Sequence, residues 1–158
     1  MKIPSWLIIA GVTIAVAAFA NILSRQDIRW FRRLQRPQWL TFEGAIPAIW
    51  IIVFICGAWS AYIVWESDPG STKTWFLMGF YLLVEATIVA YTPVMCKLKS
   101  LKAGTIIGAT GFFLGCILTL LVLPIAKWAA ILLLPYLLWS PVGTFVTWQM
   151  MQLNPADA

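Results

Sequence analysis

The chain has 158 residues, of which 61% are hydrophobic and 11% are charged, and its formal net charge is +5. A soluble domain of this length would carry roughly 25% charged residues and shorter apolar runs. The composition therefore argues against a soluble globular protein and indicates a single integral membrane domain over residues 1–158, because each helical crossing of a bilayer needs about 20 apolar residues.

Five long apolar runs predict an all-α integral membrane protein that forms a five-transmembrane-helix bundle. In chain order, we expect helices over residues 6–23, 45–65, 75–96, 103–123 and 128–151. The short connections carry turn residues, as in Asp68-Pro69-Gly70-Ser71, so consecutive helices should pack antiparallel. The first run also resembles a signal peptide, with Ala18-Phe19-Ala20 as a cleavage site, but we interpret it as a retained helix.

The connection over residues 24–44 is expected to form a lid loop at one end of the bundle. Its core is basic, and tryptophans at positions 30, 39 and 50 bracket it. Arginine head groups favour water and phosphate, and indole rings favour the headgroup zone of a bilayer. The segment should therefore lie at the membrane surface and cover the space between the helices.

The positive charges predict the orientation of the bundle. With five spans, three lysines fall on one side of the membrane: Lys2, Lys73 and Lys127. Eight cations fall on the other side: Arg25, Arg29, Arg32, Arg33, Arg36, Lys97, Lys99 and Lys102. The positive-inside rule then places the N-terminus outside and the C-terminus in the cytoplasm. Attraction to anionic membrane lipid accounts for the positive net charge, so we expect no nucleic-acid partner. The short loops favour a bacterial plasma membrane as the location.

The residue list argues against ordinary acid, base or metal catalysis. The chain has no histidine, and its three cysteines, Cys56, Cys96 and Cys116, lie in separate predicted helices without Cys-x-x-Cys spacing. They are interpreted as packing residues. No nucleophile elbow, phosphate loop or metal-binding helix motif is present in the sequence. We expect no metal, no cofactor and no catalytic residue.

Nine of the ten tryptophans fall into two groups. Four stand at the ends of predicted helices and are expected in the interfacial belt: Trp6, Trp65, Trp75 and Trp128. Five others lie near breaks or deeper in helices: Trp39, Trp50, Trp59, Trp139 and Trp148. Rigid indoles that face a bundle interior suit a large planar ligand, which they can hold by stacking. For any one of these five, core packing is an equally good interpretation.

A series of short motifs follows the first predicted helix: Trp30-Phe31-x-x-Leu34-x-Arg36-Pro37-x-Trp39, Pro47-x-x-Trp50 and Gly57-x-x-Ser60-x-Tyr62-x-x-Trp65. Further along the chain come Tyr91-Thr92-Pro93, Leu134-Pro135-Tyr136-Leu137-x-Trp139 and Leu153-Asn154. In this order, the motifs resemble those of the TspO/MBR family, the tryptophan-rich sensory proteins related to the mitochondrial translocator protein. Each motif is weak alone, but the series is specific.

The resemblance implies a pocket between the helices under the lid loop, and it implies tetrapyrrole ligands such as protoporphyrin, haem and bilins, or another planar amphiphile. The role would be that of a sensor, scavenger or transport partner in tetrapyrrole or stress regulation, and a homodimer is expected. By position, the ligand site comprises Phe31, Trp39, Phe42, Trp50, Tyr91, Trp139 and Gly143. Arg32, Arg33 and Arg36 at the lid would contact the propionates.

The chain departs from the family pattern at several pocket positions. Thr41-Phe42 replaces a Pro-Pro pair after the loop tryptophan, so the lid should be less rigid. Ile88 and Thr147 stand where the family has asparagine, and Tyr91 replaces a tryptophan. These changes remove polar groups from the pocket rim, so family ligands should bind differently or more weakly.

Glu85 lies inside the third predicted helix, where a carboxylate is costly. We leave two interpretations open: a neutral acid hydrogen-bonded to a neighbouring helix, or a contact for a ligand or a proton.

Sterol is a less favoured ligand. No Lys or Arg follows Tyr136 within reach, and Val89-x-Tyr91 with Lys97 matches the loose sterol pattern only at chance-level spacing.

Two alternatives to simple binding remain. One is light- and oxygen-dependent degradation of a bound porphyrin, and the other is a small transporter in which Glu85 handles protons.

The spacings Gly104-x-x-x-Gly108 and Gly111-x-x-x-Gly115 allow close helix contacts in lipid, either in a dimer or within one bundle.

Overall fold

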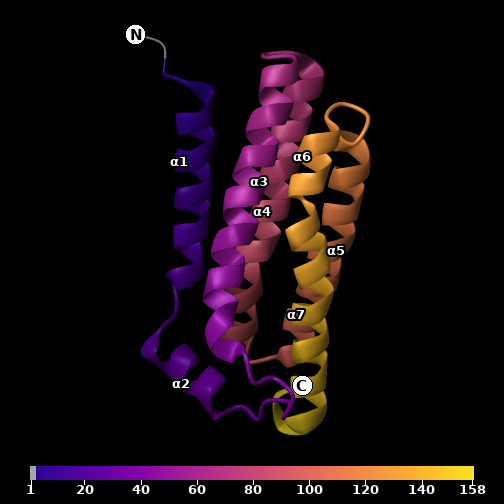
Figure 1. Ribbon diagram of the computed structural model, residues 1–158. Coiled ribbons are helices and arrows are strands. Elements are labelled where there is room, and N and C mark those ends of the chain that lie inside the picture. Colours follow the sequence, from indigo (N-terminus) through magenta and orange to yellow (C-terminus); the bar gives the residue numbers. More distant parts are fainter. Residues whose placement is uncertain (1–2) are drawn as a thin grey trace.

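The computed structural model describes residues 3–158, so Lys2 lies outside the described residues. Within this range the regular elements are all helical (Figure 1). The α-helices are α1 (Ser5–Ala18), α2 (Arg25–Arg33), α3 (Ile46–Ser67), α4 (Thr72–Leu98), α5 (Leu101–Val122), α6 (Lys127–Leu132) and α7 (Leu134–Leu153). Short 3₁₀ turns are η1 (Phe19–Asn21), η2 (Glu43–Ala45) and η3 (Pro155–Asp157).

Four helical stretches are long and apolar enough to cross a membrane: Glu43–Ser67, Thr72–Leu98, Leu101–Val122 and Lys127–Leu153. They stand side by side as a bundle, α1 runs along the flank of α3, and α2 lies across one end (Figure 1). The expectation of an all-helical membrane bundle is confirmed. The last stretch joins α6 to α7, and it breaks where Pro135, which has no N–H to donate, stands in the first turn of α7.

The first helix is shorter than predicted. An expected span over residues 6–23 ends instead at Ala18, because η1 tightens the chain there. At about 1.5 Å per residue, the 14 residues of α1 reach about 21 Å, less than the roughly 30 Å of a bilayer core. Thr13 is the buried residue of α1, and most of its apolar side chains are exposed. α1 therefore packs on the bundle as a peripheral helix.

The segment predicted as a lid loop over residues 24–44 contains a helix. Ser24 and Asp27 form a capping box, in which the Asp27 N–H donates to Ser24 Oγ at 3.1 Å and the Ser24 N–H donates to Asp27 Oδ2 at 2.9 Å. This pairing satisfies free N–H groups of the first turn and starts α2. The helix buries Trp30 and turns its arginines outward. The lid is therefore a short amphipathic helix followed by a loop.

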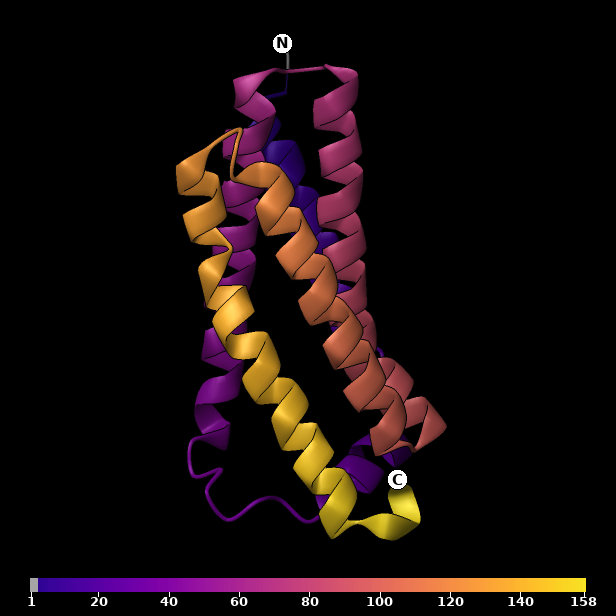
Figure 2. The same ribbon diagram turned by 90° about the vertical axis from the view of Figure 1, so that its right-hand side faces the viewer.

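The glycines of α5 serve packing within the bundle. A Cβ at Gly104 would lie 2.5 Å from Met95 Sδ of α4, and one at Gly108 would lie 2.5 Å from Thr144 Oγ1 of α7. Added methyl groups at Gly111 and Gly115 would collide with Tyr136, also of α7. Figure 2 shows α5 and α7 running side by side. Of the two uses left open for this glycine spacing, the structure shows the one inside the bundle.

Candidate ligand site

The lid and α7 bring four aromatic side chains together, which we call the lid cluster: Trp39, Phe42, Trp139 and Phe145. The Trp39 ring lies 6.2 Å from Phe42 and 6.1 Å from Phe145, centroid to centroid, and it stacks on Phe145. Phe42 meets Trp139 edge to face at 6.3 Å. Three of the predicted ligand residues are thus neighbours, and their rings are of the kind that can stack on a planar ligand.

Hydrogen bonds to the end of α7 hold the lid over the cluster. Trp39 Nε1 donates to Gln149 Oε1 at 2.5 Å. The Asn154 side chain accepts from the Gln35 N–H at 2.9 Å and donates to the Gln35 carbonyl at 3.0 Å. Leu40, which follows Trp39 in the lid, is buried. The position of the lid is therefore set without the Pro-Pro pair of the family pattern.

Trp139 has a buried indole N–H without a hydrogen-bond partner in the described part of the chain. An unpaired buried donor costs about 1–3 kcal/mol, so such a group calls for a reason. Gly143 follows one turn later on the same face of α7, and a Cβ built there would meet no atom within 4 Å. A free donor and open space therefore lie on successive turns of α7, where Trp139 contacts Phe42 of the lid.

The other predicted aromatic residues take up packing positions. Trp50 is half-buried against the core and lies 6.3 Å from Phe54. The Tyr91 hydroxyl is hydrogen-bonded to Thr147 Oγ1, which also donates to the Gly143 carbonyl at 3.1 Å. The polar groups left at these substituted positions are thus paired with each other.

The three lid arginines differ in their surroundings. Arg36 donates through Nη1 to the carbonyls of Phe31 at 2.8 Å and Leu34 at 2.5 Å, and its guanidinium lies 4.7 Å from the Phe31 ring centre. Arg36 therefore closes the C-terminal end of α2. Arg33 pairs with Asp157 at 2.8 Å. Arg32 is exposed, and no described side chain pairs with its guanidinium.

The C-terminal turn is fastened to α2 by one carboxylate. Asp157 Oδ1 accepts from Trp30 Nε1 at 2.8 Å and from Arg33 Nη2 at 2.8 Å. The indole hydrogen bond, together with the neighbouring guanidinium, holds the pKa of Asp157 below its usual value. Trp30 is therefore a buried anchor for the lid helix and not a ligand contact.

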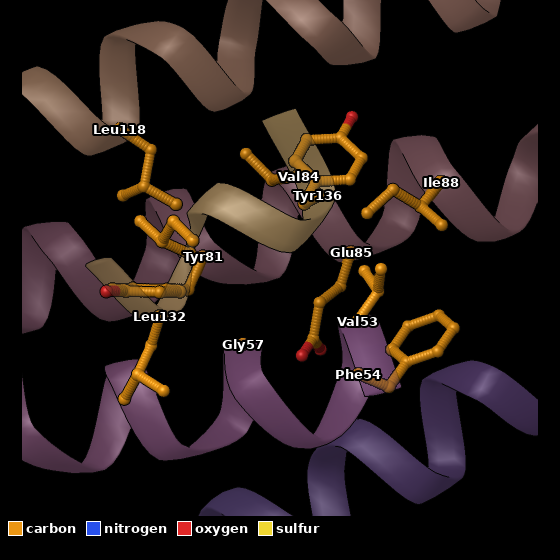
Figure 3. Close-up of a pocket in the computed structure, with 11 residues that line it drawn as sticks. Val53, Phe54, Gly57, Tyr81, Val84, Glu85, Ile88, Leu118, Leu132 and Tyr136 are labelled. Atoms are coloured by element: carbon orange, nitrogen blue, oxygen red, sulfur yellow. The ribbon is translucent and has the colours of Figure 1, made fainter. Parts of the chain in front are cut away.

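A small hollow inside the bundle, away from the lid cluster, contains Glu85 (Figure 3). Thr13 Oγ1 of α1 donates to Glu85 Oε1 at 2.7 Å, which is the hydrogen bond to a neighbouring helix that the first interpretation of this residue requires. The hollow has a cavity volume of about 30 Å³, which is room for one or two water molecules. This is far below the roughly 300–1,000 Å³ of ligand clefts.

Two residues of the lid site have no clear signal in the sequence. Phe145 and Gln149 are spaced one helical turn apart on α7, and both contact Trp39. The spacing indicates a shared helix face but not its partner. Only the path of the lid, over a hundred residues earlier in the chain, identifies them as site residues.

These features define a small multi-pass membrane protein of the helical-bundle class, with an aromatic site beneath an amphipathic lid. The chain belongs to the TspO/MBR family, whose model matches residues 7–153. It is 30% identical over 156 residues to an uncharacterized membrane protein, YtaB, of Bacillus subtilis, which covers 97% of this chain and 98% of the relative.

More distant relatives carry names drawn from the same family. The tryptophan-rich protein TspO of Bacillus cereus is 28% identical over 155 residues, which are 95% of this chain and 97% of the relative. Translocator protein 2 of the dog is 23% identical over 133 residues, which are 82% of this chain and 77% of the relative. The family's bacterial members and the membrane-spanning helices agree with a multi-pass membrane protein of bacterial type.

Proposed function

We propose that the protein binds a planar hydrophobic ligand of the tetrapyrrole class beneath the lid, and acts as a sensor, scavenger or transport partner. The observation that carries the proposal is the unpaired buried N–H of Trp139 beside the open space at Gly143. A ligand with a ring face and a carbonyl or carboxylate oxygen would satisfy both features. The aromatic rings of the lid cluster supply stacking surfaces.

The surroundings of the lid arginines restrict how an anionic ligand is held. Of the three arginines expected to contact propionates, Arg36 and Arg33 already have partners, so Arg32 is the one that remains available to a propionate. The sequence has no histidine, so a haem would bind without imidazole ligation, and metal-free protoporphyrin should bind about as well. Stacking on indole does not depend on the metal.

At about 2 Å per residue, the three residues of η1 bring the helical path of α1 close to the thickness of a bilayer core. We further propose that α1, together with η1, and the four long stretches cross the membrane with the C-terminal end in the cytoplasm. The described N-terminal end of α1 and the C-terminus lie at opposite ends of the bundle (Figure 1). The lid helix and its arginines share the end that holds the C-terminus. This distribution follows the positive-inside rule.

Tryptophan-fluorescence titration of the full chain with protoporphyrin tests the binding proposal. Trp139→Phe keeps a ring and removes the donor, so affinity should fall by about 0.5–1.5 kcal/mol, or about two- to tenfold. Trp128→Phe is the matched control, because Trp128 is 74% exposed at a helix end. Gly143→Leu should weaken binding further by filling the open space. Wild-type affinity in both Trp139→Phe and Gly143→Leu would refute the site.

Absorbance of the bound ligand, followed in light and in darkness, separates binding from degradation. If the protein destroys a bound porphyrin, absorbance of the ligand will fall under illumination in oxygenated buffer and a product will appear. A simple binding protein will leave the ligand chemically unchanged in light and in darkness.

A further inference from the structure

A basic pocket lies between α2 and the turn that joins α4 to α5, and the lid cluster takes no part in it. Its cavity volume is about 340 Å³, which is within the roughly 300–1,000 Å³ of ligand clefts. We call it the basic pocket, and it is lined by Gln26, Arg29, Trp30, Arg33 and Lys99.

One face of α2 supplies most of the lining. Gln26, Arg29, Trp30 and Arg33 are spaced three, four and seven residues from the first, so they share one side of the helix. Trp30 is buried and is fixed by its hydrogen bond to Asp157. Arg29 and Arg33 are exposed and stand one turn apart. The buried indole therefore holds two guanidinium groups at the edge of the same pocket.

Lys99 lines the pocket from a left-handed backbone conformation, with φ 50° and ψ 42°. It follows the last residue of α4, at the position where helices usually carry glycine because a Cβ is crowded there. The turn is closed by the backbone, since the Ser100 N–H donates to the Met95 carbonyl at 3.1 Å. Glycine would therefore serve the turn better than lysine. The ammonium group is what lysine adds, and it is directed to the basic pocket.

The positive charge of the pocket is not balanced by the protein. No described side chain forms an ion pair with Arg29 or Lys99. Arg33 uses Nη2 to reach Asp157, whose Oδ1 also accepts from Trp30, and its other N–H groups remain free. Three cations thus face one carboxylate. Like charges held close together repel, so an anion in the pocket would be stabilised.

The basic pocket lies at the membrane surface. The membrane-spanning stretch Thr72–Leu98 ends immediately before Lys99, and the next stretch begins at Leu101. Leu98 is 64% exposed, so an apolar side chain is available to lipid beside the ammonium group. The lid helix α2 lies across this end of the bundle (Figure 1) and packs against α4. The cations therefore stand at the level of the lipid head groups.

We propose that the basic pocket binds the head group of an anionic phospholipid such as phosphatidylglycerol. Arg29 and Arg33 would donate to the phosphate oxygens, for which a guanidinium has matching geometry, and Lys99 would add a point charge. The Gln26 amide would meet a glycerol hydroxyl, and Leu98 would contact an acyl chain. Phosphatidylcholine has the same phosphodiester, but its quaternary ammonium group would be repelled by the three cations.

Native mass spectrometry of the full-length protein in detergent tests the proposal by counting bound lipid molecules. Phosphatidylglycerol and phosphatidylcholine with identical acyl chains are titrated separately. We expect the first phosphatidylglycerol to bind at least about tenfold more tightly, and equal affinities would overturn the proposal. Glycerol 3-phosphate is the soluble probe of the same phosphate chemistry. It should displace the lipid only in large excess, whereas displacement at equal concentration would identify a soluble phosphate ester as the ligand and refute the lipid.

Two charge-matched double variants locate the preference. Arg29→Gln with Lys99→Gln removes two pocket cations and should abolish it. Lys97→Gln with Lys102→Gln removes the same charge from residues on either side of Lys99, both exposed at the same end of the bundle and both outside the pocket lining. This control should keep the preference. Equal losses in the two double variants would show attraction to diffuse surface charge and would refute a site.

Lys99→Gly separates the role of the ammonium group from folding. Glycine suits the left-handed backbone, so unfolding in detergent should require a stronger denaturant, while affinity for phosphatidylglycerol should fall about fivefold. Unchanged affinity in this variant would refute the assignment of Lys99. Trp139→Phe should leave phosphatidylglycerol binding unchanged, because Trp139 does not line the basic pocket. Failure of this proposal is therefore distinguishable from failure of the lid site.

Discussion

Substituting alanine for single glycines should separate those that serve packing from those that leave space. Gly115 of α5 is buried against the Tyr136 ring, and a built Cβ would overlap that ring. Gly143 of α7 is the matched position, because its Cβ would meet nothing within 4 Å. Both residues lie inside α-helices, so the intrinsic gain from Gly to Ala, up to about 1 kcal/mol, is the same for both.

The expected outcomes have opposite signs. Gly115→Ala should lower the free energy of unfolding, because overpacking costs about 1–3 kcal/mol and exceeds the gain in helix propensity. Gly143→Ala should leave stability unchanged or raise it by up to about 1 kcal/mol. Unfolding in mixed micelles with a denaturing detergent, followed by tryptophan fluorescence, measures the difference. If Gly115→Ala proves as stable as Gly143→Ala, the close contact of α5 with α7 is wrong.

Three further substitutions test the contacts that position the lid, the tail and α1. Thr13→Val removes the hydrogen bond to Glu85 and should lower the free energy of unfolding in the same micelles by about 0.6–1.7 kcal/mol. Val12→Ala, on the exposed face of α1, is the control, and equal losses in the two variants would show that the hydrogen bond contributes nothing. Arg36→Ala should destabilise the chain by about 1–3 kcal/mol through loss of its carbonyl contacts, whereas Arg32→Ala should weaken protoporphyrin binding at unchanged stability. The pKa of Asp157 is lowered in the folded state. Its contribution to docking of the C-terminal turn should therefore be complete above the usual carboxyl pKa and should be lost as the pH falls through the folded-state pKa. Fluorescence of Trp30 in α2 should change over this acid range, and a change that persists in Asp157→Asn would contradict the prediction.

The long helices could be predicted from apolar length alone, because a bilayer requires it. The expected helix over 103–123 and the observed Leu101–Val122 differ by one or two residues. The start of α2 was also readable in principle, since Ser24 and Asp27 have capping-box spacing. The early end of α1 at Ala18 was not readable, because residues 19–23 remain largely apolar and only their 3₁₀ turn stops the helix.

The composition of the lid site was predictable only in part. Trp39, Phe42 and Trp139 were expected there, but their grouping depends on the path of the lid. Hydrogen bonds that Trp39 and Gln35 donate to Gln149 and Asn154 determine this path. The arginines show the same limit. Composition indicates that they lie at the membrane surface, yet it cannot tell a guanidinium that caps α2 from one that is free to meet a ligand.

The polar groups that remain unpaired determine which ligand the lid site favours. The substituted rim residues Tyr91 and Thr147 satisfy each other, so they offer little to a ligand. Trp139 retains a buried donor without a partner among the described residues. A donor selects a ligand with an exposed oxygen. The lid site therefore favours a planar ligand that carries a carbonyl or carboxylate group over a wholly apolar one.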